Sequence, residues 1–272
     1  MCTNDLRLLL QEPLPDLACA TALLAQRIAY PDLDLGLLLN VVEQLAAEAA
    51  PIVAASPPKE QGAALMAFLF GSGRFRGNQD DYANPRNSFI NEILDSGLGI
   101  PISLSALFLM LSARLGIEAH GVGLPGHFVV GIASADGQRY FDPFYGGREL
   151  SIAACSRLVT QTTGYEGPLQ EAWLAPVEVA EIVARMLRNL RTVYLQAGQW
   201  SAVQCVLEQL CLVEPRVPSH MRDLGLVMFQ RRQTERGIYY LEAYLRAAPE
   251  AEDRADLQQA MAEHLARVAR LN

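Results

Sequence analysis

Two side chains of this sequence, His127 and Asp142, could do acid–base chemistry together. His127 opens the run HFVVGIAS, and Asp142 ends the run QRYFD. Both runs have the β-branched and aromatic composition of short strands, and Asp136-Gly137 between them predicts a hairpin turn. Histidine is the commonest general acid or base, and a carboxylate can accept a hydrogen bond from it.

The predicted register does not by itself bring these two side chains together. With a two-residue turn at Asp136-Gly137, Asp142 would face Gly131, about four residues or roughly 13 Å from His127. A bulge or a longer loop would be needed for contact. The simpler alternatives are that His127 is a satisfied structural histidine and that Asp142, which precedes a proline, is a turn former.

Two hydroxyls, those of Ser103 and Ser105, lie near the start of a predicted helix. This helix starts at Pro101, a residue suited to the first helical turn, and stops at Gly116. It is apolar nearly all round, which places it in the middle of a domain. Either serine could point at His127, although backbone capping for Ser103 and close packing for Ser105 are simpler roles.

The surrounding pattern indicates an α+β fold. Helical periodicity dominates the part of the chain before the central helix, and short strands that form a small antiparallel sheet follow it. We expect this first domain, with its N-terminal helices, to span residues 1–165.

The last third of the chain, residues 178–272, reads as an all-α domain with an internal repeat. Leu190 recurs as Leu224 and Pro215 as Pro249, each pair about 34 residues apart, which is the tetratricopeptide period. In the second unit Arg232 stands where the first has Gly198. The sequence after Pro249 predicts a final capping helix with a polar outer face.

Composition and charge exclude several classes of function. The net charge of −8 over 272 residues argues against nucleic-acid binding. The five cysteines form no CxxC pair, which favours buried free thiols over a disulfide framework or a zinc site. We expect no metal and no cofactor.

The sequence also predicts where the protein works. Charged residues interrupt the N-terminal segment, so it does not read as a signal peptide, and we expect a cytoplasmic protein. The uncharged run from Ser96 to Ala113 is shortened by Gly97, Gly99 and Pro101 to less than the roughly 20 residues of a membrane span. We therefore expect no membrane partner.

The stretches GIPISLSALFLMLSARLG, LPGHFVVGI and YFDPFYGG resemble the SirB-type transglutaminase-like family of bacterial proteins, whose members commonly carry C-terminal tetratricopeptide repeats. The resemblance is dense from Leu23 to Leu150. It implies a papain-like core in which cysteine, histidine and aspartate form a triad. It does not imply an assigned reaction.

The resemblance assigns roles residue by residue. His127 matches the catalytic histidine, and Asp142 matches the aspartate that orients it. The nucleophile position, counted back from the end of the central helix, falls at Pro101, which has no nucleophilic side chain. Asn87 and Asn91 belong to the family's N-S-x-x-N-E segment and would border the cleft together with Pro101 and Ser105. Capping of a helix explains Asn87 equally well.

Two functions follow from these assignments. The first is a non-catalytic transglutaminase-like protein, a pseudoenzyme, whose helical repeats bind a protein or peptide partner. The alternative is a hydrolase or amide-transfer enzyme that uses Ser103 or Ser105 as nucleophile, His127 as base and Asp142 as orienter. In the pseudoenzyme we expect His127 and Asp142 in contact, no thiol near them, and Ser103 as the nearest hydroxyl.

Overall fold

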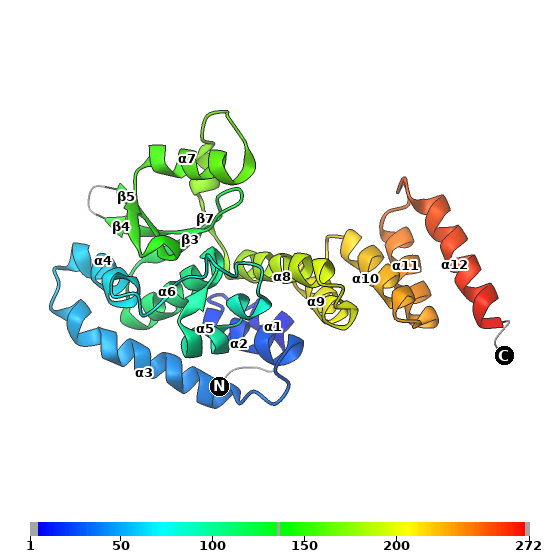
Figure 1. The fold of residues 1–272 in the computed structure, drawn as a ribbon, viewed down its shortest axis with the longest axis horizontal. Helices are drawn as coiled ribbons and strands as arrows, with labels where there is room; N and C mark the ends of the chain where they lie inside the picture. Colours follow the sequence, from blue (N-terminus) through cyan, green and yellow to red (C-terminus); the bar gives the residue numbers. More distant parts are fainter. Residues whose placement is uncertain (1–4, 135–136, 270–272) are drawn as a thin grey trace. The chain divides into compact units, whose positions relative to one another are not determined.

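The computed structural model describes residues 5–134 and 137–269 (Figure 1). These residues form two compact units, and the boundary between the units falls between Met186 and Leu187. It therefore lies inside a single helix, α8 (Val179–Gln196).

This boundary differs from the expected one. We expected the first domain to end at residue 165 and the second to begin at residue 178. The first unit is longer because strand β7 (Pro176–Val177) pairs with its sheet and Arg185 of α8 bonds to the backbone of Leu124 and His127. Pro176-Val177 is too short to show an alternating pattern, so its pairing has no signal in the sequence.

The N-terminal part of the first unit is helical, and aspartate N-caps set where two of these helices begin. The side chain of Asp16 accepts hydrogen bonds from the amides of Ala18 and Cys19, and that of Asp34 accepts one from the amide of Leu37. The helices of this part are α1 (Leu6–Leu9), α2 (Leu17–Ile28), α3 (Leu35–Ala54), α4 (Gln61–Met66) with a π-helical turn (Ala67–Gly71), and α5 (Ile90–Ser96).

The central helix, α6 (Pro101–Leu115), begins and ends at the residues that the sequence predicts. Pro101 occupies its first position, and Gly116 terminates it in the left-handed conformation at φ 68°. Every residue from Pro101 to Ser112 is buried, because helices cover one side of α6 and the sheet covers the other.

Among the described residues one helix, α3, is long and apolar enough to cross a membrane when judged by length and composition alone. Its buried residues recur at helical spacing, from Leu38 through Val42 and Leu45 to Ala49. In the fold this stripe packs against α2, α4 and α6. Here α3 is therefore an outer helix of the first unit.

The sheet of the first unit has five antiparallel strands in the order β6-β5-β4-β3-β7. Val122, Val129 and Tyr140 on one face pack against helix α7 (Ile152–Thr163), and Ile132 on the other face meets Gly62 of α4. The remaining strands of this sheet are β3 (Ala119–Val122), β4 (Val129–Ser134), β5 (Gly137–Asp142) and β6 (Arg148–Leu150). A separate parallel pair joins β1 (Arg76–Gly77) to β2 (Leu98–Gly99).

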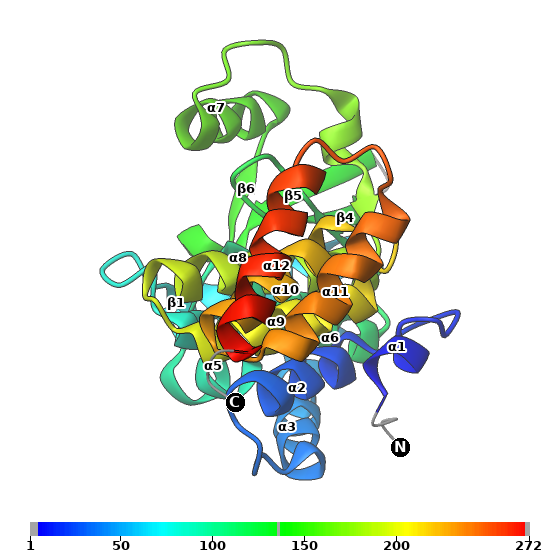
Figure 2. The same cartoon turned by 90° about the vertical axis from the view of Figure 1, so that its right-hand side faces the viewer.

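The second unit has the predicted helical repeat. After α8 come α9 (Trp200–Val213), α10 (Ser219–Gln230), α11 (Thr234–Ala247) and α12 (Arg254–Ala269), and Figure 2 shows the last three lying side by side. Leu190 and Leu224, which share a position in the repeat, are both buried. Gly225 lets α10 and α11 approach closely, because a Cβ there would lie 2.7 Å from the side chain of Leu241.

Candidate functional site

His127 and Asp142 contact each other in the first unit. The Nε2 atom of His127 lies 3.1 and 3.2 Å from the two carboxylate oxygens of Asp142. A carboxylate can only accept hydrogen bonds, so Nε2 carries the hydrogen and Nδ1 is the ring nitrogen left for another group. Asp142 is fully buried and His127 is 6% exposed, so the pair is shielded from bulk water.

The strand register explains how two residues on different elements meet. Val130 pairs with Phe141 and Ser134 with Gly137, so Asp142 comes level with Val129 and not with Gly131, as we had expected. The pairing register therefore differs from the predicted one by two residues, because Gly137 pairs with Ser134 as the first residue of β5 and is not a turn residue. Asp136 of the predicted turn lies outside the described residues.

His127 reaches Asp142 from a turn just before β4, not from the strand itself. Its amide donates to the carbonyl oxygen of Leu124, which closes this turn. Arg185 of α8 holds the same turn, because its Nη2 donates to the carbonyl oxygens of Leu124 at 2.6 Å and His127 at 2.7 Å. The guanidinium also lies over the ring of Phe128. Arg185 therefore positions the imidazole through the backbone.

The residues after β5 complete the surroundings of the pair. The ring of Tyr145 stacks on His127 with centroids 6.1 Å apart, and Phe144 meets the imidazole edge-on. Arg148 lies over Tyr145 and comes within 3.5 Å of an Asp142 oxygen. The buried carboxylate thus has a cationic neighbour, Arg148, at longer range than the imidazole.

A pocket of about 310 Å³ opens beside the imidazole. Pro101 lines it, so the N-terminal end of α6 and the imidazole border one space. This is the arrangement that the resemblance implies for a nucleophile and its base, with proline in the nucleophile's place. The lining residues are Gln79, Tyr82, Pro101, Gly126, His127, Phe144, Tyr145 and Thr162.

Neither serine lines this pocket. Ser103 is 1% exposed, and its Oγ donates to the carbonyl oxygen of Asn87 at 2.6 Å and accepts from the amide of Ile100 at 3.0 Å. This is the capping role that we considered the simpler one. Ser105 is fully buried, and its Oγ has no hydrogen-bond partner among the described residues.

Ser103, which we expected to be the hydroxyl nearest the pair, is not among the residues that line the pocket. The hydroxyl-bearing residues of the pocket are Tyr82, Tyr145 and Thr162. Burial raises the pKa of Tyr82. The hydroxyl of Thr162 bonds the carbonyl oxygen of Leu158 at 2.8 Å, within its own helix.

Asn87 and Asn91 are not among the lining residues either. The Asn87 side chain is buried and organises the preceding loop, since its Nδ2 donates to the carbonyl oxygen of Asp81 and its Oδ1 accepts from Asn78. It does not cap the next helix, because the 3₁₀ turn Pro85–Ser88 intervenes and Phe89 precedes α5. The Oδ1 atom of Asn91 is buried without a partner within the described ranges.

None of the cysteines in the described ranges lines this pocket, but the expectation of no thiol near the pair does not hold for Asp142, because Cys155 lies close enough to feel its charge. Cys155 is buried behind the sheet, where burial and the nearby Asp142 raise the pKa of its thiol to about 11. Cys205 and Cys211 are free thiols of the second unit. Cys19 is disulfide-bonded, which corrects the expectation of free thiols throughout, and Cys2 lies outside the described residues. Across 5–134 and 137–269, no group of three or more His, Cys, Asp or Glu residues could hold a metal ion.

Comparisons with known proteins match both units. The transglutaminase-like superfamily matches residues 38–188, and the tetratricopeptide repeat matches residues 190–262. A UPF0162 protein of Xylella fastidiosa is 35% identical over 253 residues, which cover 90% of this chain and 88% of that protein. A UPF0162 protein of Vibrio cholerae is 30% identical over 173 residues, covering 61% of this chain and 62% of its own.

More distant proteins share part of the chain. Human F-box only protein 21 is 28% identical over 171 residues, which cover 60% of this chain and 26% of that protein. Among solved structures, menin has a TM-score of 0.44 at 11% identity, covering 88% of this chain and 63% of the menin chain.

Proposed function

Because this chain belongs to the SirB-type transglutaminase-like family with C-terminal tetratricopeptide repeats, we propose that it is a non-catalytic member that acts by binding. The first unit keeps the fold and the histidine–aspartate pair of a catalytic site without a nucleophile. The repeats of the second unit bind a protein or peptide partner. The chain is then a pseudoenzyme joined to a binding platform.

One observation carries the loss of catalysis: Pro101 borders the same pocket as His127. Acyl transfer needs a nucleophile within hydrogen-bond reach of its base, and a thiolate at a helix N-terminus also gains from the helix dipole. The proline ring offers neither a thiol nor a hydroxyl. The two serines nearby are buried and outside the pocket, which supports the same proposal.

A screen of ester, amide and amine-transfer substrates tests this part of the proposal. The wild-type chain is expected to show no more turnover than His127→Ala, because an imidazole without a nucleophile does not complete acyl transfer. Turnover that depends on His127 would contradict the loss of catalysis. The hydrolase alternative has the His127–Asp142 contact in its favour. It further requires Ser103→Ala or Ser105→Ala to abolish that turnover.

The second unit supports the binding part of the proposal. It contains a largely apolar pocket of about 500 Å³, to which α8, α9, α10 and α12 contribute side chains. Leu195, Trp200 and Leu226 line it and are 41%, 41% and 39% exposed, so they leave apolar surface for a partner to cover. Arg191 and Asp223 form an ion pair at the same pocket.

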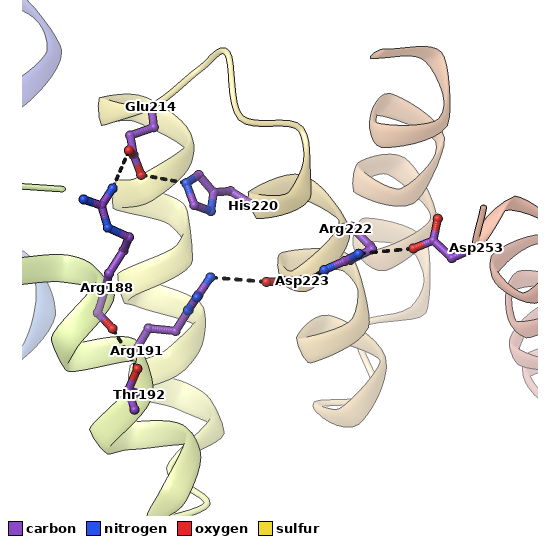
Figure 3. A network of polar contacts seen from close by, with 8 residues as sticks. All are labelled: Arg188, Arg191, Thr192, Glu214, His220, Arg222, Asp223 and Asp253. Carbon is purple, nitrogen blue, oxygen red and sulfur yellow. Dashed lines mark hydrogen bonds and ion pairs between the residues drawn. The ribbon is translucent and has the colours of Figure 1, made fainter. Parts of the chain in front are cut away.

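A network of ion pairs fixes the helices around this pocket (Figure 3). Each contact joins two different elements, and the contacts gather near the C-terminal end of α9, the first turns of α10 and the start of α12. The ion pairs are Arg188–Glu214, Arg191–Asp223 and Arg222–Asp253, and the ring of His220 forms a hydrogen bond with Glu214. A platform braced in this way loses little conformational freedom when a partner binds.

Capture of partners by the full-length chain, quantified by mass spectrometry, tests the binding part. Leu226→Glu places a charge in the apolar pocket and is expected to lose the partners that wild type retains. Leu8→Glu in α1 is the matched control, because Leu8 is 57% exposed and lies outside the second unit. Identical partner sets for both variants, or no specific partner for the wild type, would count against a repeat-mediated interaction.

A further inference from the structure

A second pocket of the first unit, of about 630 Å³, lies at the C-terminal end of α6. It shares no lining residue with the pocket of His127. Leu17, Leu109, Met110 and Ile182 form apolar walls, and its volume is in the range of small-molecule sites. The apolar wall continues outward to Leu14, whose side chain is 90% exposed.

The charged groups of this pocket are mostly acidic. Asp16, Glu43 and Glu178 line it, against the single guanidinium of Arg114. Glu178 is exposed and has no ion-pair partner among the residues that the structure describes. The pocket therefore carries more carboxylates than cations.

Arg114 is not available to bind an anion. Its Nε donates to Glu43 at 2.5 Å, its Nη1 donates to the carbonyl oxygen of Met110 at 3.1 Å, and its Nη2 lies 3.6 Å from Asp16. The Arg114 side chain is only 15% exposed. Asp16, Glu43 and Glu178 are called the acidic rim below. Arg114 neutralises one of these three negative charges, so the rim keeps a net negative charge.

Helix ends also border the pocket. The last turns of α6 contribute the negative end of a helix dipole, whereas the first residues of α2 and α8 contribute positive ends, next to the carboxylates of Asp16 and Glu178. The one imidazole in the lining, that of His120, has its pKa lowered by burial, so it adds no positive charge near neutral pH.

We propose that this pocket binds a small organic cation, an apolar alkyl or aryl group that carries an ammonium. The apolar walls take the hydrocarbon part, and the acidic rim with the end of α6 takes the charge. An anion of the same shape meets three carboxylates, and a neutral molecule gains only the apolar contact.

Three probes that share one hydrocarbon part test the assignment: 4-phenylbutylamine, 4-phenylbutanol and 4-phenylbutyrate, titrated into the full chain by calorimetry at low salt. The amine is expected to bind at least about tenfold more tightly than the alcohol, and its binding is expected to weaken as salt is added. The butyrate is expected to bind most weakly. Equal affinities for all three, or no binding of the amine at millimolar concentration, would overturn the proposal.

Variants locate the binding. Glu178→Gln is expected to lower the affinity for the amine by about two- to fivefold, which is the range for loss of an exposed ion pair. Glu166→Gln is the matched control, since Glu166 is also exposed and unpaired within the described part of the chain and lies outside this pocket. Ala113→Phe fills the pocket from an exposed position and is expected to abolish binding while the melting temperature stays unchanged. Unchanged amine affinity in Ala113→Phe would place the amine elsewhere.

A peptide with blocked ends and a lysine between two leucines tests whether the ligand is a small molecule or the lysine of a protein. The amine probe is expected to bind and the peptide is not, because the peptide backbone adds polar groups that the apolar walls of the pocket do not satisfy. Binding of the peptide alone would overturn the small-molecule assignment.

Discussion

The imidazole of His127 contacts the carboxylate of Asp142 through Nε2, not through Nδ1. The choice of ring nitrogen fixes how the residue can act, because Nδ1 is then the only nitrogen that a group in the pocket can reach. Arg185, bound to the backbone carbonyls of Leu124 and His127, keeps the histidine turn in this orientation. The imidazole is therefore held through its ring by Asp142 and through its backbone by Arg185.

Removing either member of this pair is expected to destabilise the first unit. His127→Ala or Asp142→Ala leaves a buried polar group without its partner, at a cost of about 1–3 kcal/mol in the free energy of unfolding. The double variant is expected to cost less than the sum of the two by about 0.5–3 kcal/mol. Urea unfolding in a Trp200→Phe background measures this, because Trp173 then reports on the first unit alone. Additive effects would show that the two residues are energetically independent.

Pro101→Cys is expected to restore a reactive thiol. The new side chain would lie at the first position of α6, in the pocket of His127, where the dipole and the imidazole favour the thiolate. Its pKa is expected to fall from about 8.5 to between about 3.5 and 7.5. The pH dependence of alkylation by iodoacetamide measures it, and Pro101→Ala gives the background. A rate that is the same in Pro101→Cys with and without His127→Ala would show that the imidazole does not reach this position.

The two serines of α6 are expected to respond oppositely to alanine. Ser103→Ala removes bonds to Asn87 and Ile100 in a buried site, so the unfolding free energy is expected to fall by about 1–3 kcal/mol. Ser105→Ala removes a buried hydroxyl that has no partner among the described residues, so stability is expected to stay equal or to rise. The melting temperatures of the two variants, compared with that of the wild type, test this prediction. A clear loss for Ser105→Ala would reveal a bond that this structure does not contain.

The thiol of Cys155 is expected to be inert at pH 8. Its pKa is raised to about 11 because burial, and secondarily Asp142, disfavour the thiolate. The unfolded chain loses this proton near pH 8.5 and the folded chain near pH 11. This contribution to stability is therefore present below about pH 8.5 and declines as the pH rises toward 11. Peptide mapping after alkylation of the native chain checks the reactivity, and full modification of Cys155 at pH 8 is the contrary result.

Arg232 is expected to be replaced by glycine with a gain in stability. It adopts φ 58°, close to the φ 64° of Gly198 at the same point of the preceding repeat, and it is the only non-glycine with positive φ in the described ranges. The left-handed conformation costs an L-residue about 1–2 kcal/mol, so Arg232→Gly should recover about 1 kcal/mol. Gly198→Ala should lose a similar amount, since open space surrounds its Cβ position and only the backbone strain remains. Unfolding in a Trp173→Phe background, where Trp200 reports on the second unit, measures both.

The parts of the fold that local sequence determines were predictable. Pro101 and Gly116 delimit α6 by their own backbone preferences, and the 34-residue period places Leu190 and Leu224 in equivalent buried positions. The departure of Arg232 from glycine, which weakens the repeat in the sequence, does not change the local backbone.

The contacts that complete the site were not predictable, because they join distant residues without a pattern. Arg185 binds the carbonyl of a residue 58 positions earlier, and such a bond depends on the backbone of the acceptor and not on its side chain. Ser103 likewise bonds the carbonyl of Asn87. The His127–Asp142 contact was expected from family resemblance alone, because a two-residue change in hairpin register decides it.

Helix α8 makes the two halves of this protein difficult to separate. It runs unbroken for 18 residues across the boundary between the units, and its first half supplies Arg185 while its second half supplies Arg191. A protease cut or a gene truncation between Met186 and Leu187 would expose a bare helix end with up to four unpaired carbonyls or amides on each fragment. A cut before Val179 would instead take Arg185 away from the turn of His127. Each fragment made for expression therefore has to include the whole of α8, so the smallest stable pieces of the two halves overlap in sequence.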